Sequence, residues 1–314
     1  MLDLHRLRLL RELHRRGTLA AVAQALSYSP SAVSQQLSVL ENEAGVTLLE
    51  RVGRNVRLTG PALTLVEHTE HLFELMERAE AELATSRTGL TGITRIASFQ
   101  TVAMTLLPDV LGTAAAEHPG MEVCLSQLEP ESALPALLAH DFDLVIAEEY
   151  PGLNLVRDSQ LNSALLLEDP MYLCVPASRP EWTAGSTSAL AEAPWVMEPD
   201  GSASRAWVTS LCREAGFEPH IRYSADDMIL HRTLIARGLA VGFLPGLAVD
   251  DAPPEMILHR LARGNACRRI YTVTRRGAQA HPMIVYLRDA LSAAAAALTP
   301  PSNVHRTTLV AAQS

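Results

Sequence analysis

Apolar residues recur at helical spacing through the first forty residues of the chain. Leucines at every third position from Leu4 to Leu13 predict a first helix, and the small residues of 20–25 predict a second that packs closely on its neighbours. A third helix is expected to start at Pro30 with Ser29 as its N-cap, because a proline at the first helical position loses no hydrogen bond. Its inward-facing positions are Val33, Leu37 and Leu40.

The opposite face of this third helix is polar. Ser31, Ser34, Gln35 and Ser38 lie between the apolar positions, and their side chains are short, uncharged and able to form hydrogen bonds. A surface of this kind can contact base edges in the major groove of DNA. Two short helices joined by a sharp turn, the second with a polar front, therefore predict a helix-turn-helix.

A short hairpin that carries arginines is predicted directly after it, at residues 50–57. A glycine and an asparagine suit its turn, and the positive charges of Arg51, Arg54 and Arg57 are placed to hold a DNA backbone. The hairpin would form the wing of a winged helix-turn-helix. Five arginines of the first helix either touch phosphate as well or form a solvated face: Arg6, Arg8, Arg11, Arg15 and Arg16.

A long amphipathic helix is predicted over 61–88. Its main apolar stripe follows spacings of three and four residues, through Ala62, Val66, Thr69, Phe73, Met76 and Leu83. The stripe is widened by Leu65, Leu72, Leu75 and Ala79. A helix of this length spans about 42 Å, and a single exposed one is only marginally stable. The stripe therefore predicts a partner helix, as in a dimer, and packing within one chain is the alternative.

The second half of the chain alternates strands with helices after a hinge at 88–92. Strands are expected at 93–98, 121–127, 143–147, 171–175, 195–197, 221–224, 240–244 and 269–274. Helices are expected at 102–117, 130–140, 203–215, 227–237 and 281–298. This alternation predicts a parallel α/β sheet, arranged in two lobes. Residues 299–314 are expected to form a disordered tail.

Charge divides the chain in the same way as these patterns. Residues 1–60 carry eight arginines and five acidic residues, a net charge of +3, and residues 61–314 carry −12, which together give −9. A basic head on an acidic body fits a protein of which one part binds phosphate while the rest avoids it.

Several classes of protein are excluded by missing signals. No run of about 18 apolar residues could span a membrane, and the amino terminus lacks the pattern of a signal peptide. The four cysteines are far apart, without a Cys-x-x-Cys motif, so we expect a reduced, cytoplasmic setting. These cysteines are Cys124, Cys174, Cys212 and Cys267.

Neither an enzyme nor a cofactor or metal site is predicted. The chain lacks a nucleophile elbow, a zinc-protease motif, a Walker loop and a dinucleotide fingerprint. A cluster at 67–71 has metal-binding residue types, but it lies off the apolar stripe of the long helix and has no third ligand. We expect its members to form a solvated face: Glu67, His68, Glu70 and His71.

The first sixty residues closely resemble the amino-terminal pattern of the LysR-type transcriptional regulators. The matching residues are Ala20-Ala21-Val22-Ala23, Leu26, Ser29-Pro30-Ser31-Ala32-Val33-Ser34, Leu37, Leu40-Glu41, Gly45-Val46, Leu48-Leu49, Arg51 and Leu58-Thr59. Three features depart from the pattern. Gln35 stands where an arginine is frequent, Leu49 where a phenylalanine is frequent, and Gly60-Pro61-Ala62 replaces the usual ending. These differences bear on which operator is bound.

The resemblance implies a full architecture. It comprises a winged helix-turn-helix at 1–60, a linker and dimerisation helix at 61–88, and an effector domain at 93–298 that resembles periplasmic binding proteins. Lobe I of that domain would hold 93–163 and 269–298, and lobe II 164–268. The implied partners are double-stranded promoter DNA, a small-molecule effector, further copies of the chain in a homodimer or homotetramer, and RNA polymerase. The expected DNA contacts are Ser29, Pro30, Ser31, Ser34, Gln35, Arg51, Arg54 and Arg57.

Candidate effector contacts lie where strands end, because ligands of open α/β sheets bind there, often at helix amino termini. The segment Ser98-Phe99-Gln100-Thr101 matches the effector-cleft segment of the family, although its hydroxyls could also serve only as helix caps. Ser202 and Ser204 repeat the arrangement in the second lobe. Further candidates at strand ends are Glu148, Asp226 and Phe243.

The expected cleft is acidic, with Arg205 as its one basic residue against Glu148, Glu149, Glu198, Asp200, Asp226 and Asp227. This balance predicts an effector with a positive group, or a zwitterion such as an amino acid. Thiol sensing through Cys212 is an alternative mode of control, although this cysteine shares a helix face with apolar residues and fits a buried structural thiol better. A solute-binding protein and an enzyme are the alternatives from other classes.

Overall fold

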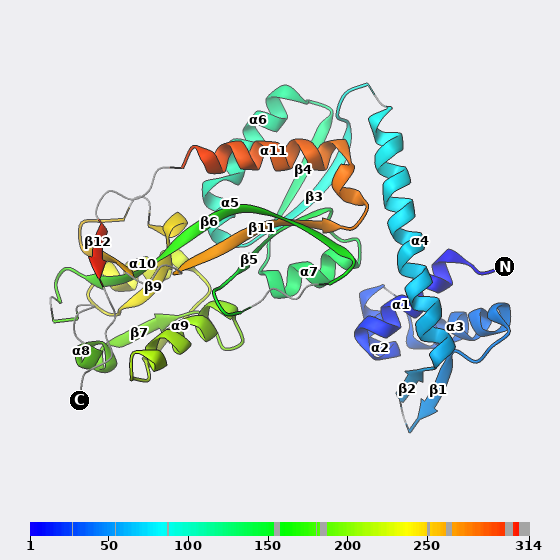
Figure 1. The fold of residues 1–314 in the computed structure, drawn as a ribbon, viewed down its shortest axis with the longest axis horizontal. Helices are drawn as coiled ribbons and strands as arrows, with labels where there is room; N and C mark the ends of the chain where they lie inside the picture. The colour runs from blue at the N-terminus through cyan, green and yellow to red at the C-terminus, as the bar shows by residue number, and fades with distance from the viewer. Residues whose placement is uncertain are drawn as a thin grey trace.

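The computed structural model describes residues 1–26, 28–53, 55–86, 88–153, 158–179, 181–182, 187–249, 252–261, 266–298 and 304–307. Figure 1 shows the elements in three parts: an amino-terminal head, one long helix and a larger α/β domain. The head contains the helices α1 (Leu4–Arg16), α2 (Leu19–Ala25) and α3 (Pro30–Ala44), followed by the hairpin strands β1 (Leu49–Val52) and β2 (Asn55–Leu58).

Local capping signals set the bounds of the helices in the head. Thr18 accepts a hydrogen bond from the Ala21 amide at 3.2 Å and so caps α2. Gly17 and Gly45 end α1 and α3 in the left-handed conformation that glycine adopts readily. One apolar core joins the three helices to the hairpin and to the start of the following helix. The predicted winged helix-turn-helix is thus present.

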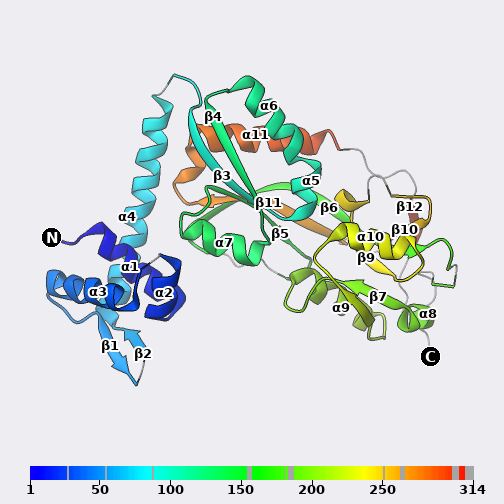
Figure 2. The ribbon, with the colours of Figure 1, turned by 180° about the vertical axis from the view of Figure 1, so that it is seen from behind.

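The head is turned so that α3 and the hairpin lie on the side away from the α/β domain. Figures 1 and 2 show α2 on the side nearer to that domain, α3 at the far edge of the head, and the hairpin projecting from its end.

The long helix α4 (Gly60–Thr85) begins at the cap Thr59 and serves two surfaces. Val66 and Thr69 are buried, Val66 within the core of the head, and Phe73 lies under the Arg11 guanidinium at 4.4 Å. Most of the predicted stripe therefore packs within the chain, as the alternative interpretation held. A second apolar row on the same helix remains exposed: Leu72, Leu75, Met76, Ala79 and Leu83.

The α/β domain is built on one eight-stranded sheet that runs through both lobes. Its order is β12-β10-β6-β11-β5-β3-β4, and β9 also pairs with β6. The strands are β3 (Gly92–Ser98), β4 (Met121–Gln127), β5 (Leu144–Glu149), β6 (Leu161–Pro176), β9 (Gly242–Pro245), β10 (Met256–Leu261), β11 (Cys267–Arg275) and β12 (Val304–Thr307). A separate pair is formed by β7 (Pro194–Met197) and β8 (His220–Ser224).

The sheet is mixed rather than parallel throughout. β3 runs parallel to both β4 and β5, as predicted, but β6 and β11 run antiparallel to their neighbours. These two long strands cross from one lobe to the other, so the chain can pass between lobes without leaving the sheet.

Helices cover both faces of each lobe because alternate residues of a strand point to opposite sides. In lobe I, α5 (Gln100–Thr105), α6 (Leu107–Glu117) and α11 (Pro282–Ala296) pack with Ile96, whereas α7 (Pro130–Leu138) packs with Ala97 on the other face. In lobe II, α8 (Thr187–Glu192) and α9 (Ala203–Glu214) cover one face and α10 (Met228–Ala236) the other. The short helical turns are η1 (Gly246–Ala248) and η2 (Ala278–Ala280).

Two sequence-based expectations for this domain are wrong. The helix expected at 102–117 is divided at Leu106, where the chain restarts as α6 with Pro108 in its first turn. Within the tail expected at 299–314, Val304–Thr307 forms β12 and pairs in parallel with β10. The edge strand β10, which the sequence analysis did not predict, offers the free backbone groups that this pairing uses.

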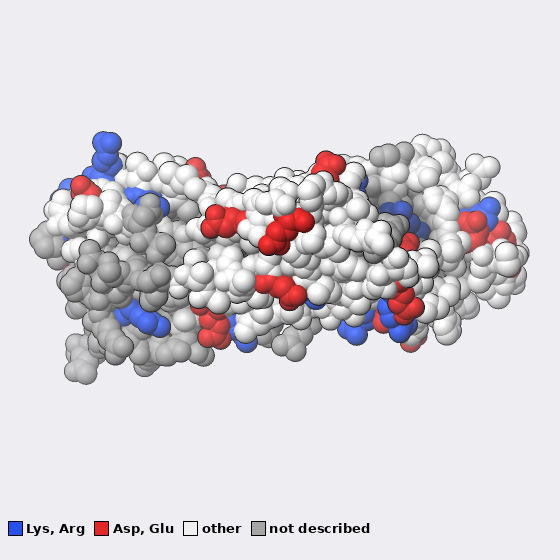
Figure 3. Space-filling view, turned by 90° about the horizontal axis from the view of Figure 1, so that it is seen from above, with Lys and Arg blue, Asp and Glu red and all other residues white. Residues whose placement is uncertain are grey.

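One face of the molecule is acidic in its middle part. From above, several acidic patches lie over the middle of the molecule with little positive charge between them (Figure 3). Among the described residues, no helix is both long and apolar enough to cross a bilayer.

Candidate functional site

The amino-terminal end of α3 is held in place by its own serines. Ser29 accepts a hydrogen bond from the Ala32 amide at 3.2 Å, and its hydroxyl lies 3.0 Å from that of Ser31. Pro30 occupies the first turn, as predicted. At the other end of α3, the Glu41 carboxylate accepts hydrogen bonds from the Leu48 and Leu49 amides, which fixes the hairpin relative to the helix.

The predicted polar front of α3 is exposed. Ser31, Ser34 and Gln35 are all open to solvent, whereas the apolar positions of the same helix are buried in the head. The front therefore combines hydrogen-bonding side chains with a rigid apolar back, which is the arrangement that base contacts require.

The hairpin presents charge beside this front. Arg51 is exposed, and Arg57 is paired with Glu50 at 3.0 Å between Nη2 and Oε2. The two side chains of this pair are 73% and 52% exposed, so the pair contributes little to stability and can be exchanged for a phosphate contact. Arg54 lies outside the described residues.

Three arginines of α1 have a different environment from the phosphate contact or solvated face that the sequence suggested. Arg8 donates to the Ala139 carbonyl at 2.8 Å and Arg15 to the Leu138 carbonyl at 3.4 Å, and Arg11 is buried. These side chains are directed toward α7 and α4 because this face of α1 packs against both helices.

A buried arginine lies where the two lobes of the α/β domain meet. The Arg268 side chain, 3% exposed, bonds to Glu148 at 2.5 Å, to Asp169 at 2.7 Å and to the Thr101 hydroxyl at 2.6 Å. Its guanidinium also lies 5.0 Å from the centre of the Phe99 ring. Burial by itself lowers the Arg268 pKa, but the adjoining carboxylates outweigh it and the net shift is upward. This residue thus ties together α5, β5 and β6.

The segment 98–101 is already engaged within the chain. The Ser98 hydroxyl is fully buried and donates to the Phe99 carbonyl at 3.1 Å, and Thr101 accepts from Arg268. Gln100 reaches across to lobe II, where its amide nitrogen donates to Asp227 at 2.9 Å and its amide oxygen accepts from the Met228 backbone at 2.7 Å. Gln100 therefore links the lobes.

Lobe II contributes the opposite wall. Ser202 caps α9 by accepting from the Arg205 amide at 3.1 Å, and Ser204 is buried in the first turn of the helix. The ring of Phe243 is stacked on Trp195 at 6.2 Å in the core of the lobe. A cavity of about 10 Å³, enough for one water-sized group, lies between these walls. Its polar lining is Tyr150, Glu198, Ser204, Arg205, His231 and Arg268.

Carboxyl groups around this cavity favour their protonated form. Burial raises the pKa of Glu198 to about 8, with further contributions from Glu148 and Glu129. Burial likewise raises the pKa of Glu129 to about 7, and Glu148, Glu131 and Asp226 add to the effect while Arg268 opposes it. Such carboxyls have few compensating cations nearby and would gain from a positively charged ligand.

One buried acceptor in the cavity wall has no partner. His231 is 2% exposed, and its Nε2 lies 2.7 Å from the Ala225 carbonyl. Since a carbonyl can only accept, Nε2 carries the proton, and because burial lowers the His231 pKa the ring is neutral. Nδ1 is then a bare lone pair, buried and without a hydrogen bond.

The structure brings together some predicted cleft residues and adds others. Thr101 and Glu148 meet at Arg268, and Ser204 and Phe243 line the cavity, while Asp226 is exposed nearby. The cleft thus has a second basic residue, Arg268, where only Arg205 was expected. Arg268 and Ile270 lie two residues apart on β11 and so face the same side of the sheet. An arginine in line with buried apolar positions was therefore the feature of the sequence that could have identified it. Glu129, Asp169, Tyr150 and His231 are recognisable only from the fold.

Other chemistries find little support among the residues described. Burial raises the pKa of the Cys212 thiol to about 12, which disfavours a reactive thiolate. All four cysteines are free. Within the described ranges, no group of three or more His, Cys, Asp or Glu side chains is placed to hold a metal ion.

Comparison with known families matches both parts of the molecule. Residues 4–62 match the bacterial regulatory helix-turn-helix of the LysR family, and residues 87–296 match the LysR substrate-binding domain. The chain belongs to the LysR family of transcriptional regulators. It is therefore a DNA-binding regulator with a domain for a small effector, and it is neither an enzyme nor a solute-binding protein.

Relatives of this LysR-type regulator cover most of its length. The transcriptional dual regulator GltC of Bacillus subtilis is 26% identical over 256 residues, which span 81% of this chain and 84% of that protein. OxyR of Escherichia coli K12 is 28% identical over 237 residues, 74% of each protein.

Solved structures of full-length LysR regulators share the fold. An OxyR variant from Pseudomonas aeruginosa has a TM-score of 0.56 at 21% identity and covers 93% of this chain and all of that one. CbnR in complex with its target DNA has a TM-score of 0.52 at 22% identity, with 93% of this chain and all of that one covered.

Proposed function

We propose that this LysR-type regulator responds to a small effector that carries a protonated amine, as an amino acid does, bound between the two lobes. The domain limits that go with this proposal are 1–60, 61–88 and 93–298, with the lobes divided at 163 and 268. Its DNA contacts are the front of α3, from Ser29 to Gln35, and the arginines of the hairpin.

The observation that carries the choice of effector is the set of acceptors around the cavity. His231 offers the unpaired Nδ1, and Glu198 offers a carboxyl that ionises readily once a cation lies beside it. A protonated amine has three N–H donors and a positive charge, and so it satisfies both groups.

A carboxylate on the same effector has a partner within reach. Arg205 lines the cavity, and its ion pair at 3.1 Å is with Asp200, whose side chain is 93% exposed. Because Asp200 is almost fully exposed, it can be replaced at little cost, even though the Arg205 side chain is only 21% exposed. This assigns the effector carboxylate to Arg205 rather than to the segment 98–101, whose Thr101 is occupied by Arg268.

The cavity holds only one water-sized group, so the lobes must part to admit an effector and close again around it. The two hydrogen bonds of Gln100, to Asp227 and to the Met228 amide, span the lobes and have to break. This fits a cleft that opens and closes like those of periplasmic binding proteins.

Calorimetric titration of the whole chain tests the effector class. A panel of free amino acids, their N-acetyl derivatives and dicarboxylates separates the amine from the carboxylate. We expect heat only from compounds with a free amine, and a loss of at least about tenfold in affinity in Glu198→Gln, whose side chain cannot ionise. Binding confined to the dicarboxylates would reject the amine.

The exposed row of α4 supports assembly with a second copy of the chain. Leu72, Leu75 and Leu83 are 43%, 55% and 69% exposed and lie along one side of the helix. A partner helix would bury this row and provide the homodimer from which a tetramer is built. Leu75→Glu should then give a monomer in light scattering, whereas Glu67→Arg, at an exposed position away from this row, should leave the dimer intact.

Thiol control of the same architecture is the alternative. It requires a low-pKa, accessible thiol, and the burial of Cys212 and Cys174 works against both requirements. The metabolite effector is therefore the better supported mode. A contact with RNA polymerase at the promoter completes the proposed set of partners.

A further inference from the structure

The DNA-binding head rests on one end of a helix whose other end lies at the effector cleft. That helix, α7, has nine residues and is about 13 Å long. Its carbonyl end contacts α1, and its amino end follows Glu129 and Leu128. Figure 1 shows α7 beneath the sheet of lobe I, between the head and the remainder of the domain.

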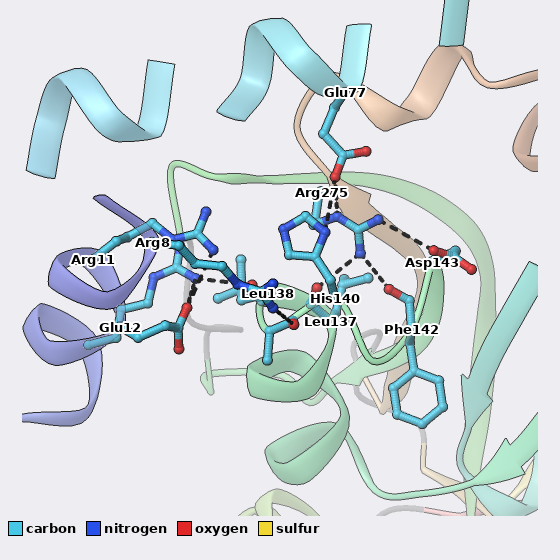
Figure 4. A network of polar contacts seen from close by, with 12 residues as sticks. Arg8, Arg11, Glu12, Glu77, Leu137, Leu138, His140, Phe142, Asp143 and Arg275 are labelled. Atoms are coloured by element: carbon cyan, nitrogen blue, oxygen red, sulfur yellow. Dashed lines mark hydrogen bonds and ion pairs between the residues drawn. The ribbon is translucent and has the colours of Figure 1, made fainter. Parts of the chain in front are cut away.

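Arginines from outside α7 bind its carbonyl end. Arg8 donates to Ala139 at 2.8 Å, Arg15 to Leu138 at 3.4 Å, and Arg275 of β11 to Leu137 at 3.1 Å (Figure 4). The last carbonyls of a helix lack internal partners and carry partial negative charge, so guanidinium groups stabilise them. The same face of α1 would otherwise be an uncompensated positive surface, because Arg11, Arg15 and Arg16 share the single carboxylate of Glu12.

The long helix α4 takes part in the same junction. Glu77 of α4 pairs with Arg275 and lies 3.5 Å from His140, the residue that follows α7 in the left-handed conformation. Gly277 approaches α4 so closely that an added Cβ would lie 2.5 Å from the Glu74 carbonyl. The head, α4 and the end of α7 thus meet at one place (Figure 4).

The amino end of α7 is joined to the cleft. The Leu128 amide donates to the Ser98 carbonyl at 3.0 Å, which ties the start of α7 to the segment that leads to Thr101 and Arg268. Burial raises the pKa of Glu129, and the charges of Glu148, Asp226 and Arg268 are close enough to shift it further. A change of charge in the cleft therefore acts first on this end of the helix.

The sides of α7 leave room for it to shift. Only Pro130, Ala133 and Leu137 are buried within it. A groove of about 380 Å³ separates its outer side from α1, lined by Glu12, Arg15, Arg16, Pro130, Glu131, Leu134, Pro135, Leu138, Asp158 and Leu161. A rigid helix with loose flanks and polar contacts at both ends can slide or tilt more easily than a closely packed one.

We propose that α7 couples the effector cleft to the head, with the basic face of α1 as a docking surface for the carbonyl end of α7. The coupling rests on the proposed function only in taking the cleft as the effector site. A cation bound near Glu129 would alter the position of α7, and Arg8 and Arg15 would pass that change to the head. The two arginines are then positioning residues for the head rather than contacts to DNA.

A double-mutant cycle tests the coupling without knowledge of the effector. Glu129→Gln removes a carboxylate at the cleft end, and Arg8→Ala with Arg15→Ala removes the docking. The readout is the affinity of the full chain for a duplex that carries the region upstream of its own gene. We expect Glu129→Gln to change this affinity by at least about fivefold in the native background and to have no effect once docking is lost.

Matched variants make the outcome specific. Arg16→Ala removes the same charge from α1, but among the described residues its side chain bonds only to Glu12, at 2.9 Å, so the effect of Glu129→Gln should persist in this variant. The double variant Arg8→Lys with Arg15→Lys keeps the positive charges but lacks the planar guanidinium groups. It serves as a control for a folding defect in the alanine variant. Small-angle scattering should give a larger radius of gyration for the double alanine variant alone.

Two results would overturn the coupling: an equal effect of Glu129→Gln in all backgrounds, or no effect in any. Unchanged scattering of the double alanine variant would also reject the docking. A native chain that fails to bind the duplex at all would instead count against the proposed function, so the two failures are distinguishable.

Discussion

The amide of Gln100 in lobe I donates to the carboxylate of Asp227 in lobe II at 2.9 Å. The same side chain accepts from the Met228 amide, so one residue bonds the first turn of α10 twice. Asp227 is also the N-cap of α10, where its side chain accepts from the Ile229 amide. The hydrogen bond from Gln100 lowers the pKa of Asp227, so this carboxylate stays charged to a more acidic pH than an ordinary aspartate.

Gln100→Ala should loosen α10 at its amino end. Loss of the acceptor frees the Met228 amide, and a hydrogen bond of this kind contributes about 0.5–1.5 kcal/mol, so its hydrogen exchange should accelerate by about two- to tenfold. Mass spectrometry of the exchange measures this. Gln127→Ala, at an exposed position on β4, is the control and should leave α10 unchanged. Equal exchange in all three proteins would mean that the contact is not formed in solution.

Arg268→Met should destabilise the effector domain strongly. The substitution leaves Glu148 and Asp169 buried without their counter-ion, a situation that costs about 3–5 kcal/mol. Arg213→Met is the matched control, since its ion pair with Glu218 joins side chains that are 64% and 67% exposed and contributes at most about 1 kcal/mol. Urea unfolding compares the two. Similar losses in both variants would contradict the central place given to Arg268.

Glu198 should make the stability of the effector domain fall as the pH rises. Its pKa is about 8 in the folded protein against 4.5 as the ordinary value, so the folded state keeps a proton that the unfolded chain has released. This contribution is complete below about pH 4.5 and is lost as the pH passes through about 8. Glu198→Gln cannot ionise. Between pH 5 and pH 8.5, the free energy of unfolding should fall less in this variant than in the native protein. Equal falls in the two proteins would refute the role given to Glu198.

Substitutions in the head should separate affinity from specificity. Arg51→Ala should weaken binding to every duplex and reduce the slope of log affinity against log salt by about one, because one phosphate contact is lost. Gln35→Ala should instead change the ranking of operator variants. Gel shifts at several salt concentrations measure both. A change of ranking in Arg51→Ala, or a uniform loss in Gln35→Ala, would reverse the two roles.

Cys124 should be the first thiol to react in the native protein. It is exposed, whereas Cys174 and Cys212 are buried and burial raises the pKa of both. A maleimide added to the folded chain should label Cys124 within minutes and the buried pair only after unfolding. Peroxide should leave operator binding unchanged both in the native chain and in Cys212→Ser. A peroxide response that disappears in Cys212→Ser would favour thiol control.

The head was predictable because its determinants are local. Ser29, Pro30 and the apolar positions of α3 lie within one segment, and each acts on backbone a few residues away. The residues around the cleft were predictable only in part. Thr101 and Glu148 stand at strand or helix ends that a pattern can find, but their common partner Arg268 comes from a strand more than a hundred residues later.

The arginines of α1 also depend on residues that are distant in the sequence. Arg8 and Arg15 look like any basic helix face until α7, more than a hundred residues away in the sequence, is placed against them. The stripe of α4 was identified correctly as apolar, but the sequence left open whether it packs within the chain or on a second copy. Val66 and Thr69 pack within the chain because α1 folds back on them, while Leu72 and Leu75, assigned only a widening role, remain uncovered.

The placement of α3 and the hairpin on the side of the head away from the α/β domain constrains how transcription can be controlled. A duplex can reach this side without meeting the rest of its own chain, so no part of the protomer has to be cleared for it. An effector therefore cannot act by exposing or covering the DNA-binding side of the head. It acts instead through the angle and spacing at which neighbouring heads meet successive turns of the promoter, so footprints should change in length and phase.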